Sequence, residues 1–243
     1  MIRLENDMLL AFSGDSITDG NRQQRMDCNH IFGHGYQTVI AGRLGADNLD
    51  TRPKFLNMGH AGWTASMIFS KWEEEILPFK PSIISILAGI NDVIAGWRDQ
   101  ISAEQVSNAY LACCREALER THEALPGVKC ILCEPFFKAA HNHSRPYRNV
   151  PHPIHGEDFQ LLDFGVSEEQ IEFFESALAE MRKGLRALGE EFGCVYVPLQ
   201  DLFDEAAKKA PVEYFIWDSV HPTLVGHELI ARRWLETVGK AIK

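Results

Sequence analysis

Four short polar motifs in the chain carry side chains that could perform acyl transfer. Gly14-Asp15-Ser16 follows an apolar run, and Asp218-Ser219-Val220-His221 precedes the last helical stretch. A serine hydroxyl is a weak nucleophile that needs an adjacent base, and the imidazole of His221 titrates near neutrality. A carboxylate on the other ring nitrogen, from Asp218, would hold the required tautomer. These residue types predict ester hydrolysis through an acyl-serine intermediate.

The other two motifs offer donors for the oxyanion of a tetrahedral intermediate. They read NMGHAG, which ends at Gly62, and GIND, which contains Asn91. The backbone N–H groups of Ser16 and Gly62 and the side-chain amide of Asn91 could supply three preorganised donors. Glycine suits this role because no Cβ blocks the approach of a substrate. Gly59 competes with Gly62, since both glycines also suit tight turns.

Each of these residues also has a structural explanation. Ser16 could cap the first helix, His221 could cap the last one, and Asn91 could occupy a turn. The neighbouring Gly14, Asp15 and Asp218 favour the catalytic interpretation of Ser16 and His221. The carboxylates of Asp15 and Asp92 are predicted to accept hydrogen bonds from nearby backbone N–H groups.

The elements that must position these motifs form an alternating pattern. Stretches with helical period separate five short apolar runs, and we predict buried strands at Met8–Ser13, Lys54–Met58, Ser82–Ala88, Lys129–Glu134 and Cys194–Leu199. Alternating strands and helices imply a parallel sheet with helices on both faces. In such sheets ligands bind at the carboxyl ends of the strands, so the motifs ending the first three strands should meet at one edge.

Three long helices have recognisable sequence signals. Ser102 and Ser167 begin capping boxes, and Pro222 is predicted at the first position of the last helix. The expected apolar face after Ser167 is Ile171, Phe174, Leu178, Met181, Leu185, Leu188 and Phe192. That of the last helix is Val225, Leu229, Trp234, Leu235 and Val238.

Length, composition and charge restrict the class of protein. A chain of 243 residues with 45% apolar residues is predicted to form one globular domain over residues 1–243. The net charge of -10 argues against a nucleic-acid partner, because phosphate binding needs a basic surface. No apolar run approaches the roughly 20 residues that span a bilayer, and no secretory signal is recognisable. We therefore expect a cytoplasmic protein.

Cysteine usage favours reduced, structural thiols. Six cysteines are too few for a disulfide scaffold in a chain of this length. Cys130 and Cys133 form a C-x-x-C motif inside an apolar run, where positions three apart on a strand point to opposite faces. We therefore predict core cysteines there, in place of a thioredoxin-like or zinc motif.

The segment from Lys138 to Gly165 interrupts the alternation and is too long for a simple connection. It contains His141, His143, His152 and His155, and three prolines. A metal site there is the less favoured interpretation, because Cys and carboxylate ligands at close spacing are lacking. We expect instead a loop that folds over the active-site edge and restricts substrates to short acyl groups; a position away from the cleft, or against a neighbouring subunit, is the alternative.

Taken together, the motifs GDSITD, NxGxxG, GxND and DxxH resemble those of the GDSL/SGNH hydrolase family. They occur in the family's order and extend over nearly the whole chain. The resemblance implies a flavodoxin-like, three-layer α/β/α fold with a five-stranded parallel sheet. It also implies a serine esterase without a cofactor or metal, in which Ser16 is the nucleophile, Asp218 and His221 complete the triad, and Gly62 and Asn91 are oxyanion donors.

Two further segments resemble bacterial GDSL-like esterases, some of which deacetylate carbohydrates: Glu134-Pro135-Phe136 and Trp217–Pro222. The expected substrate is thus a short acyl ester, such as acetyl, of a carbohydrate or another small molecule. A lysophospholipase or thioesterase for longer chains, or an acyltransferase, remains the alternative. An anion-binding module is disfavoured because Asp15 would repel phosphate. The oligomeric state, a homo-oligomer included, is left open.

Overall fold

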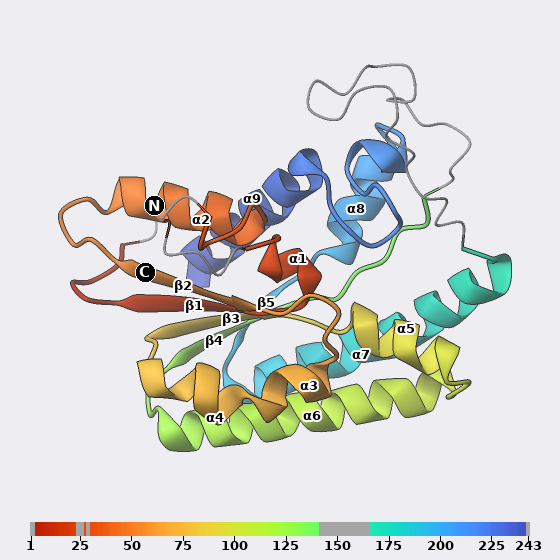
Figure 1. Ribbon diagram of the computed structural model, residues 1–243, viewed down its shortest axis with the longest axis horizontal. Coiled ribbons are helices and arrows are strands. Elements are labelled where there is room, and N and C mark those ends of the chain that lie inside the picture. Colours follow the sequence, from red (N-terminus) through yellow and green to blue (C-terminus); the bar gives the residue numbers. More distant parts are fainter. Residues whose placement is uncertain (1–2, 23–26, 28–29, 141–165, 242–243) are drawn as a thin grey trace.

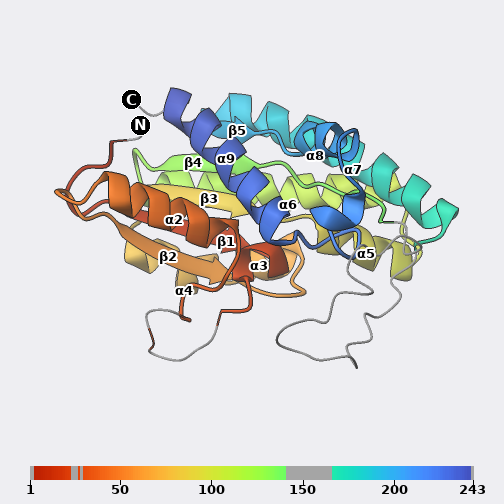
Figure 2. The ribbon, with the colours of Figure 1, turned by 90° about the horizontal axis from the view of Figure 1, so that it is seen from above.

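A parallel sheet forms the centre of the molecule. The computed structural model describes residues 3–22, 27, 30–140 and 166–241. Its strands are β1 (Leu9–Gly14), β2 (Lys54–Gly59), β3 (Ile83–Leu87), β4 (Lys129–Cys133) and β5 (Val195–Val197). They pair in parallel in the order β2-β1-β3-β4-β5; Figure 1 shows the sheet at the centre of the molecule, and Figure 2 shows the order of the strands. The five predicted strands are therefore confirmed.

The fifth strand is shorter than predicted, and the chemistry of the next residues explains why. Pro198 has no backbone N–H to donate to a sheet. The N–H of Leu199 donates instead to the buried Glu134 carboxylate, at 2.7 Å. The same carboxylate accepts the N–H of Gln200, at 2.8 Å, and so satisfies the start of the following helix.

Helices cover both faces of the sheet, which gives the predicted three layers (Figures 1 and 2). One face carries α2 (Tyr36–Asp47), α8 (Gln200–Ala207) and α9 (Leu224–Ala241). The other carries α3 (Ala65–Ser70), α4 (Trp72–Glu75), α5 (Ile90–Arg98), α6 (Ala103–Ala124) and α7 (Glu168–Phe192). Across the part of the chain that the structure describes, none of these helices is long and apolar enough to cross a membrane.

The helix starts test the predicted sequence signals. Ser102 and Ser167 both form complete capping boxes, each with the glutamine three residues later. The prediction for Pro222 is wrong, because α9 begins only at Leu224. Thr223 supplies the cap, since its hydroxyl accepts the N–H of Val225 at 3.2 Å, while Pro222 forms an antiparallel bridge with Ile216.

One buried tryptophan connects a helix to the sheet, and another, on the opposite face, connects two helices to each other. On the α9 face, the indole N–H of Trp234 donates to the Ser85 hydroxyl in β3 at 3.0 Å. On the opposite face, the indole N–H of Trp72 donates to Thr121 of α6 at 2.7 Å. Both rings are almost fully buried. Because each polar atom has a partner, burial of these large rings stabilises the core without an orphaned donor.

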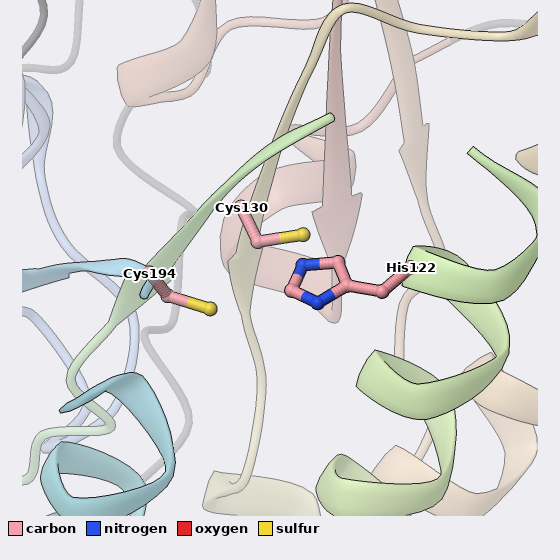
Figure 3. Close-up of side chains that lie close together, drawn as sticks. All are labelled: His122, Cys130 and Cys194. Atoms are coloured by element: carbon pink, nitrogen blue, oxygen red, sulfur yellow. The ribbon is translucent and has the colours of Figure 1, made fainter. Parts of the chain in front are cut away.

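The two cysteines of the C-x-x-C motif are buried and point to opposite faces of β4, as predicted. The Cys133 sulfur lies 3.6 Å from the Ser85 hydroxyl, which itself contacts Trp234 of α9. The Cys130 sulfur points to the other face, towards α6 (Figure 3). The motif therefore does not form one dithiol site.

Candidate active site

The nucleophile motif lies at the carboxyl end of β1. Gly14 packs so closely on β3 that a Cβ there would lie 2.1 Å from the Leu87 carbonyl oxygen. Asp15 caps the short helix α1 (Ser16–Asp19), and its carboxylate accepts the Ile17 N–H at 3.0 Å. Ser16 is thus the first residue after a sharp strand-to-helix turn, where its side chain remains partly exposed.

The predicted catalytic side chains form one hydrogen-bonded chain. The Ser16 hydroxyl oxygen lies 2.8 Å from Nε2 of His221, and Nδ1 of the same ring lies 2.5 Å from the Asp218 carboxylate. This order, hydroxyl to imidazole to carboxylate, is what proton removal from a serine requires. Asp218 is nearly buried, so its charge is poorly screened by water.

The loop that carries Asp218 and His221 is folded around the carboxylate. Asp218 accepts the backbone N–H groups of Val220, at 3.1 Å, and of His221, at 2.6 Å. Ser219 adopts a positive φ of 75°, which closes the turn between the two residues. The indole of Trp217 stacks on the His221 ring, with centroids 5.8 Å apart. The imidazole is therefore held from two sides.

The electrostatics suit a histidine that binds a proton during the reaction. Burial disfavours the charged ring, but the hydrogen bond and charge of Asp218, with a contribution from Asp15, outweigh it and raise the pKa of His221. Burial also raises the pKa of Asp15 to about 7, although the Ile17 N–H opposes that shift. Both Asp15 and Asp92 accept backbone N–H groups, as predicted.

Asn91 and Asp92, at the start of α5, anchor the turn that contains Gly62. The Asn91 amide donates one N–H to the Trp63 carbonyl oxygen at 3.0 Å, which leaves its second N–H for another acceptor. The Asp92 carboxylate accepts the Ala65 N–H at 3.0 Å. Gly62 itself is exposed, with φ of 80°, and no atom lies within 4 Å of where its Cβ would be.

Gly59 is excluded from the oxyanion role by its own contacts. Its N–H donates to the Asn57 side chain at 2.9 Å, so that donor is already satisfied. A Cβ at Gly59 would lie 2.2 Å from the Asp19 backbone nitrogen, which explains why glycine is needed there. Of the two competing glycines, Gly62 therefore has the freer N–H.

A cavity of about 230 Å³ opens beside the Ser16–His221 pair. Its lining combines the polar side chains of Ser16, Asp19, Asn21, His34, His221 and His227 with Ile17, Gly20, Ala61, Trp217 and Pro222, and more of the exposed lining is apolar than polar. Gly62 and Asn91 are not among these residues, although Ala61 directly precedes Gly62. The structure thus brings Ser16, Asp218 and His221 together, and places Gly62 on the turn next to Ala61 with Asn91, on α5, bonded to the same turn through the Trp63 carbonyl.

Several lining residues were not predicted from the sequence. His227 accepts the Tyr36 N–H on Nδ1 at 3.1 Å, and burial, with His34 and His221 nearby, lowers the pKa of His227 to about 4. It is therefore neutral at physiological pH. His34 packs edge-on against it, at 6.3 Å between centroids. Neither residue belongs to a recognisable motif, and only the fold brings them to Ser16.

The long segment from Lys138 to Gly165 begins beside the active site. The Ala140 N–H donates to the Ser219 hydroxyl at 2.9 Å, and the Lys138 N–H donates to the Ser219 carbonyl at 3.3 Å. Residues 141–165 lie outside the described residues, and with them the four predicted loop histidines. The proposed covering of the active site by this loop therefore stays a prediction.

Comparison with known proteins identifies the family. The model of the GDSL-like lipase/acylhydrolase family matches residues 12–229, which include all four motifs. The chain belongs to this family. The predicted resemblance is confirmed, and the chain is a serine esterase of the GDSL type.

Relatives of this GDSL-type esterase cover almost its whole length. An acetylxylan esterase of Geobacillus stearothermophilus is 29% identical over 238 residues, which is 95% of this chain and 93% of the relative. The structure of a GDSL-like lipase from Parabacteroides merdae is 32% identical, with 98% of each chain covered and a TM-score of 0.78. The crystal structure of Axe2, an acetylxylan esterase from G. stearothermophilus, is 25% identical, with 97% of this chain and 95% of that one covered and a TM-score of 0.74.

Proposed function

We propose that this GDSL-type esterase removes short acyl groups, above all acetyl, from hydroxyl groups of carbohydrates. The observation that carries the proposal is the Ser16–His221–Asp218 chain, which opens on a small cavity whose lining includes several polar side chains. A cavity of about 230 Å³ has room for an acetyl group and part of a sugar. Its polar side chains offer donors and acceptors for sugar hydroxyls, and its small volume leaves little room for a long acyl chain.

The reaction follows from the order of the hydrogen bonds. His221 Nε2 accepts the Ser16 proton while the serine oxygen attacks the ester carbonyl carbon. The Ser16 and Gly62 N–H groups and the second N–H of Asn91 stabilise the resulting oxyanion. The Asp218 carboxylate accepts a hydrogen bond from the Nδ1–H of the imidazolium and stabilises its charge without taking the proton.

Collapse of the intermediate completes the first half of the reaction. His221 returns its proton to the departing alkoxide oxygen, so the sugar hydroxyl leaves neutral and the acyl group stays on Ser16. A water molecule then attacks the acyl-serine, again giving its proton to His221. The carboxylic acid leaves, and Ser16 regains its proton.

The relatives support the choice of substrate. An acetylxylan esterase from Geobacillus stearothermophilus matches nearly the full chain in sequence, and the crystal structure of an acetylxylan esterase from the same organism matches it in fold. Trp217, with 40% of its surface exposed at the cavity, provides an aromatic face of the kind that packs on a sugar ring. We infer that the alcohol side of the ester is a sugar and that the acyl side is short.

The test is a chain-length series of p-nitrophenyl esters, run beside acetylated xylooligosaccharides, with release of acetate as the readout. We expect the highest kcat/KM for acetate, falling as the acyl chain lengthens, and acetate release from the sugar esters. Ser16→Ala is the control for background hydrolysis. A preference for long acyl chains would contradict the proposal and favour a lysophospholipase or thioesterase. Transfer of acetyl to an added sugar in preference to water would identify an acyltransferase.

A further inference from the structure

A second group of reactive side chains lies at the opposite edge of the sheet. Figure 3 shows His122, Cys130 and Cys194 pointing towards one another. Their possible ligand atoms all lie within 4.8 Å of each other. They come from three separate places: the last turn of α6, the start of β4, and the residue before β5. Ser16, in contrast, follows the carboxyl end of β1.

We propose that these three side chains bind one Zn²⁺ ion through two thiolates and one imidazole. Cysteine sulfur and histidine nitrogen are the ligands that zinc prefers. Metal–ligand bonds of about 2.0–2.3 Å in a tetrahedron place the ligand atoms roughly 3.4–3.8 Å apart. Separations of up to 4.8 Å therefore need to shorten by roughly 1.0–1.4 Å at most.

The three side chains differ in how freely they can move, and this difference would let the ligand atoms approach one another. Cys130 is almost fully buried and fixed by the pairing of β4 with its neighbours. His122 and Cys194 are only partly buried and lie at the ends of their elements. Cys194 follows Gly193, the left-handed residue that ends α7. Small side-chain rotations of His122 and Cys194 can close the site around a fixed Cys130.

Strand register places the two cysteines side by side. Ile131 pairs with Val195 in parallel register, so Cys130 and Cys194 lie opposite each other. Neighbouring strands are about 4.8 Å apart, which brings side chains on the same face of the sheet close enough to share one ion. Both cysteines are free thiols. The same spacing is compatible with a disulfide, whose Cα atoms lie about 4.4–6.8 Å apart, so the experiment must distinguish the ion from that bond.

Charge and access decide the kind of ion. Two thiolates and a divalent cation sum to zero, which matters because Cys130 is buried and a net charge there would be costly. Binding releases one proton from each thiol, and no oxidant or reductant is involved. Because His122 and Cys194 are partly exposed, a water molecule can reach the fourth coordination position of the ion.

The ion would tie the end of α6 to two strands that are already paired with each other. It would connect the end of α6 to the starts of β4 and β5, near the ring of Phe192, which lies 5.7 Å from the His122 ring. At a free Zn²⁺ concentration of about a hundred times Kd, we expect Tm to rise by roughly 5–10 °C.

The experiment uses purified, reduced protein, with Co²⁺ as the spectroscopic probe and Zn²⁺ for stoichiometry and Tm. We expect one equivalent of metal and a thiolate-to-cobalt charge-transfer band, which histidine ligands alone do not produce. Cys194→Ser and His122→Gln should weaken metal binding at least about a hundredfold, because even changes behind the ligands cost 10–100-fold. Cys194→Ser should also weaken the charge-transfer band.

The matched control is Cys113→Ser, which changes a partly buried α6 thiol outside the cluster and should retain the band and the Tm shift. Because Cys130→Ser changes a buried residue and could impair folding, the half-buried Cys194 carries the test. The proposal is wrong if wild-type protein gives no thiolate band, if Cys194→Ser binds metal as wild type does, or if mass spectrometry of native protein finds a Cys130–Cys194 disulfide.

Discussion

The two edges of the sheet organise their reactive groups in different ways. At the carboxyl edge, Ser16, His221 and Asp218 are already joined by hydrogen bonds of 2.8 and 2.5 Å. At the amino edge, His122, Cys130 and Cys194 only converge to within 4.8 Å. The first arrangement is complete before any ligand arrives, which is what transition-state stabilisation requires. The second needs an ion to complete it.

Backbone hydrogen bonds account for much of this difference. The Asp218 carboxylate accepts two N–H groups of its own loop, and Asn91 and Asp92 hold the turn around Gly62. The amino-edge group has only the register of β4 and β5 and the last turn of α6. Changes at the carboxyl edge should therefore act on rate, and changes at the amino edge on stability and metal binding.

The largest expected effect is that of Ser16→Ala, which should lower kcat by about 10⁵–10⁶-fold, because removing a nucleophile disables the whole triad. Tm and metal binding should stay as in wild type, since the only contact found for the hydroxyl is His221. Steady-state kinetics, thermal unfolding and metal titration measure the three quantities. Ser70→Ala, an exposed serine on α3, is the matched control. Labelling by an organophosphonate at another residue would exclude Ser16 as the nucleophile.

Asn91→Ala should lower kcat by about 10²–10³-fold, the usual cost of one oxyanion donor. The same amide also holds the Trp63 carbonyl, so part of the loss would come from movement of the Gly62 turn. Asp92→Asn keeps an acceptor for the Ala65 N–H and separates these contributions, because it should leave kcat much closer to wild type. An unchanged kcat in Asn91→Ala would remove Asn91 from the oxyanion hole.

The pH dependence should reflect the histidine at the carboxyl edge. The pKa of His221 is raised, so the imidazole stays protonated, and unable to accept the serine proton, up to a higher pH than a free imidazole. Below that pKa, kcat/KM should fall about tenfold per pH unit. Asp218→Asn removes the main stabilising partner of the charge and should move the inflection to lower pH. A flat profile between about pH 5 and 8 would exclude His221 as the base.

The two edges also differ in how much the sequence could predict. Ser16 lies in a motif at a strand end, so its place at the carboxyl edge follows from the parallel sheet, whereas Asp218 and His221 are assigned to the same site from their residue types, their spacing and the family resemblance. Their catalytic roles remain predictions that the experiments above test. His122, Cys130 and Cys194 share no motif, and their proximity depends on the register of β4 against β5. Register cannot be obtained from strand patterns alone.

Helices α7 and α9 differ in how well their buried faces could be predicted from the sequence. On α7, the positions Phe174, Leu178, Met181, Leu185 and Leu188 are buried as predicted, because large apolar residues mark that face. On α9, the buried face includes Gly226 and His227. A Cβ at Gly226 would lie 2.1 Å from the Phe215 carbonyl oxygen, so close packing requires glycine there. Hydrophobicity does not detect a glycine or a neutral histidine in a core.

The smallest expected effect tests whether the edges are independent. Removal of metal by a chelator should leave kcat/KM within about twofold of its starting value, because distant sites without shared partners change each other by only a few tenths of a kcal/mol. None of the hydrogen bonds found around Ser16, His221 and Asp218 involves His122, Cys130 or Cys194. The same treatment should lower Tm if Zn²⁺ was bound at the amino edge. Assay, thermal unfolding and metal analysis of one chelated sample, with Cys194→Ser in parallel, measure both responses.

Loss of activity that returns with Zn²⁺ in wild type but not in Cys194→Ser would show that the two edges are coupled. Loss that Zn²⁺ restores in both proteins would instead require a metal ligated elsewhere, and would contradict the metal-free mechanism proposed for Ser16.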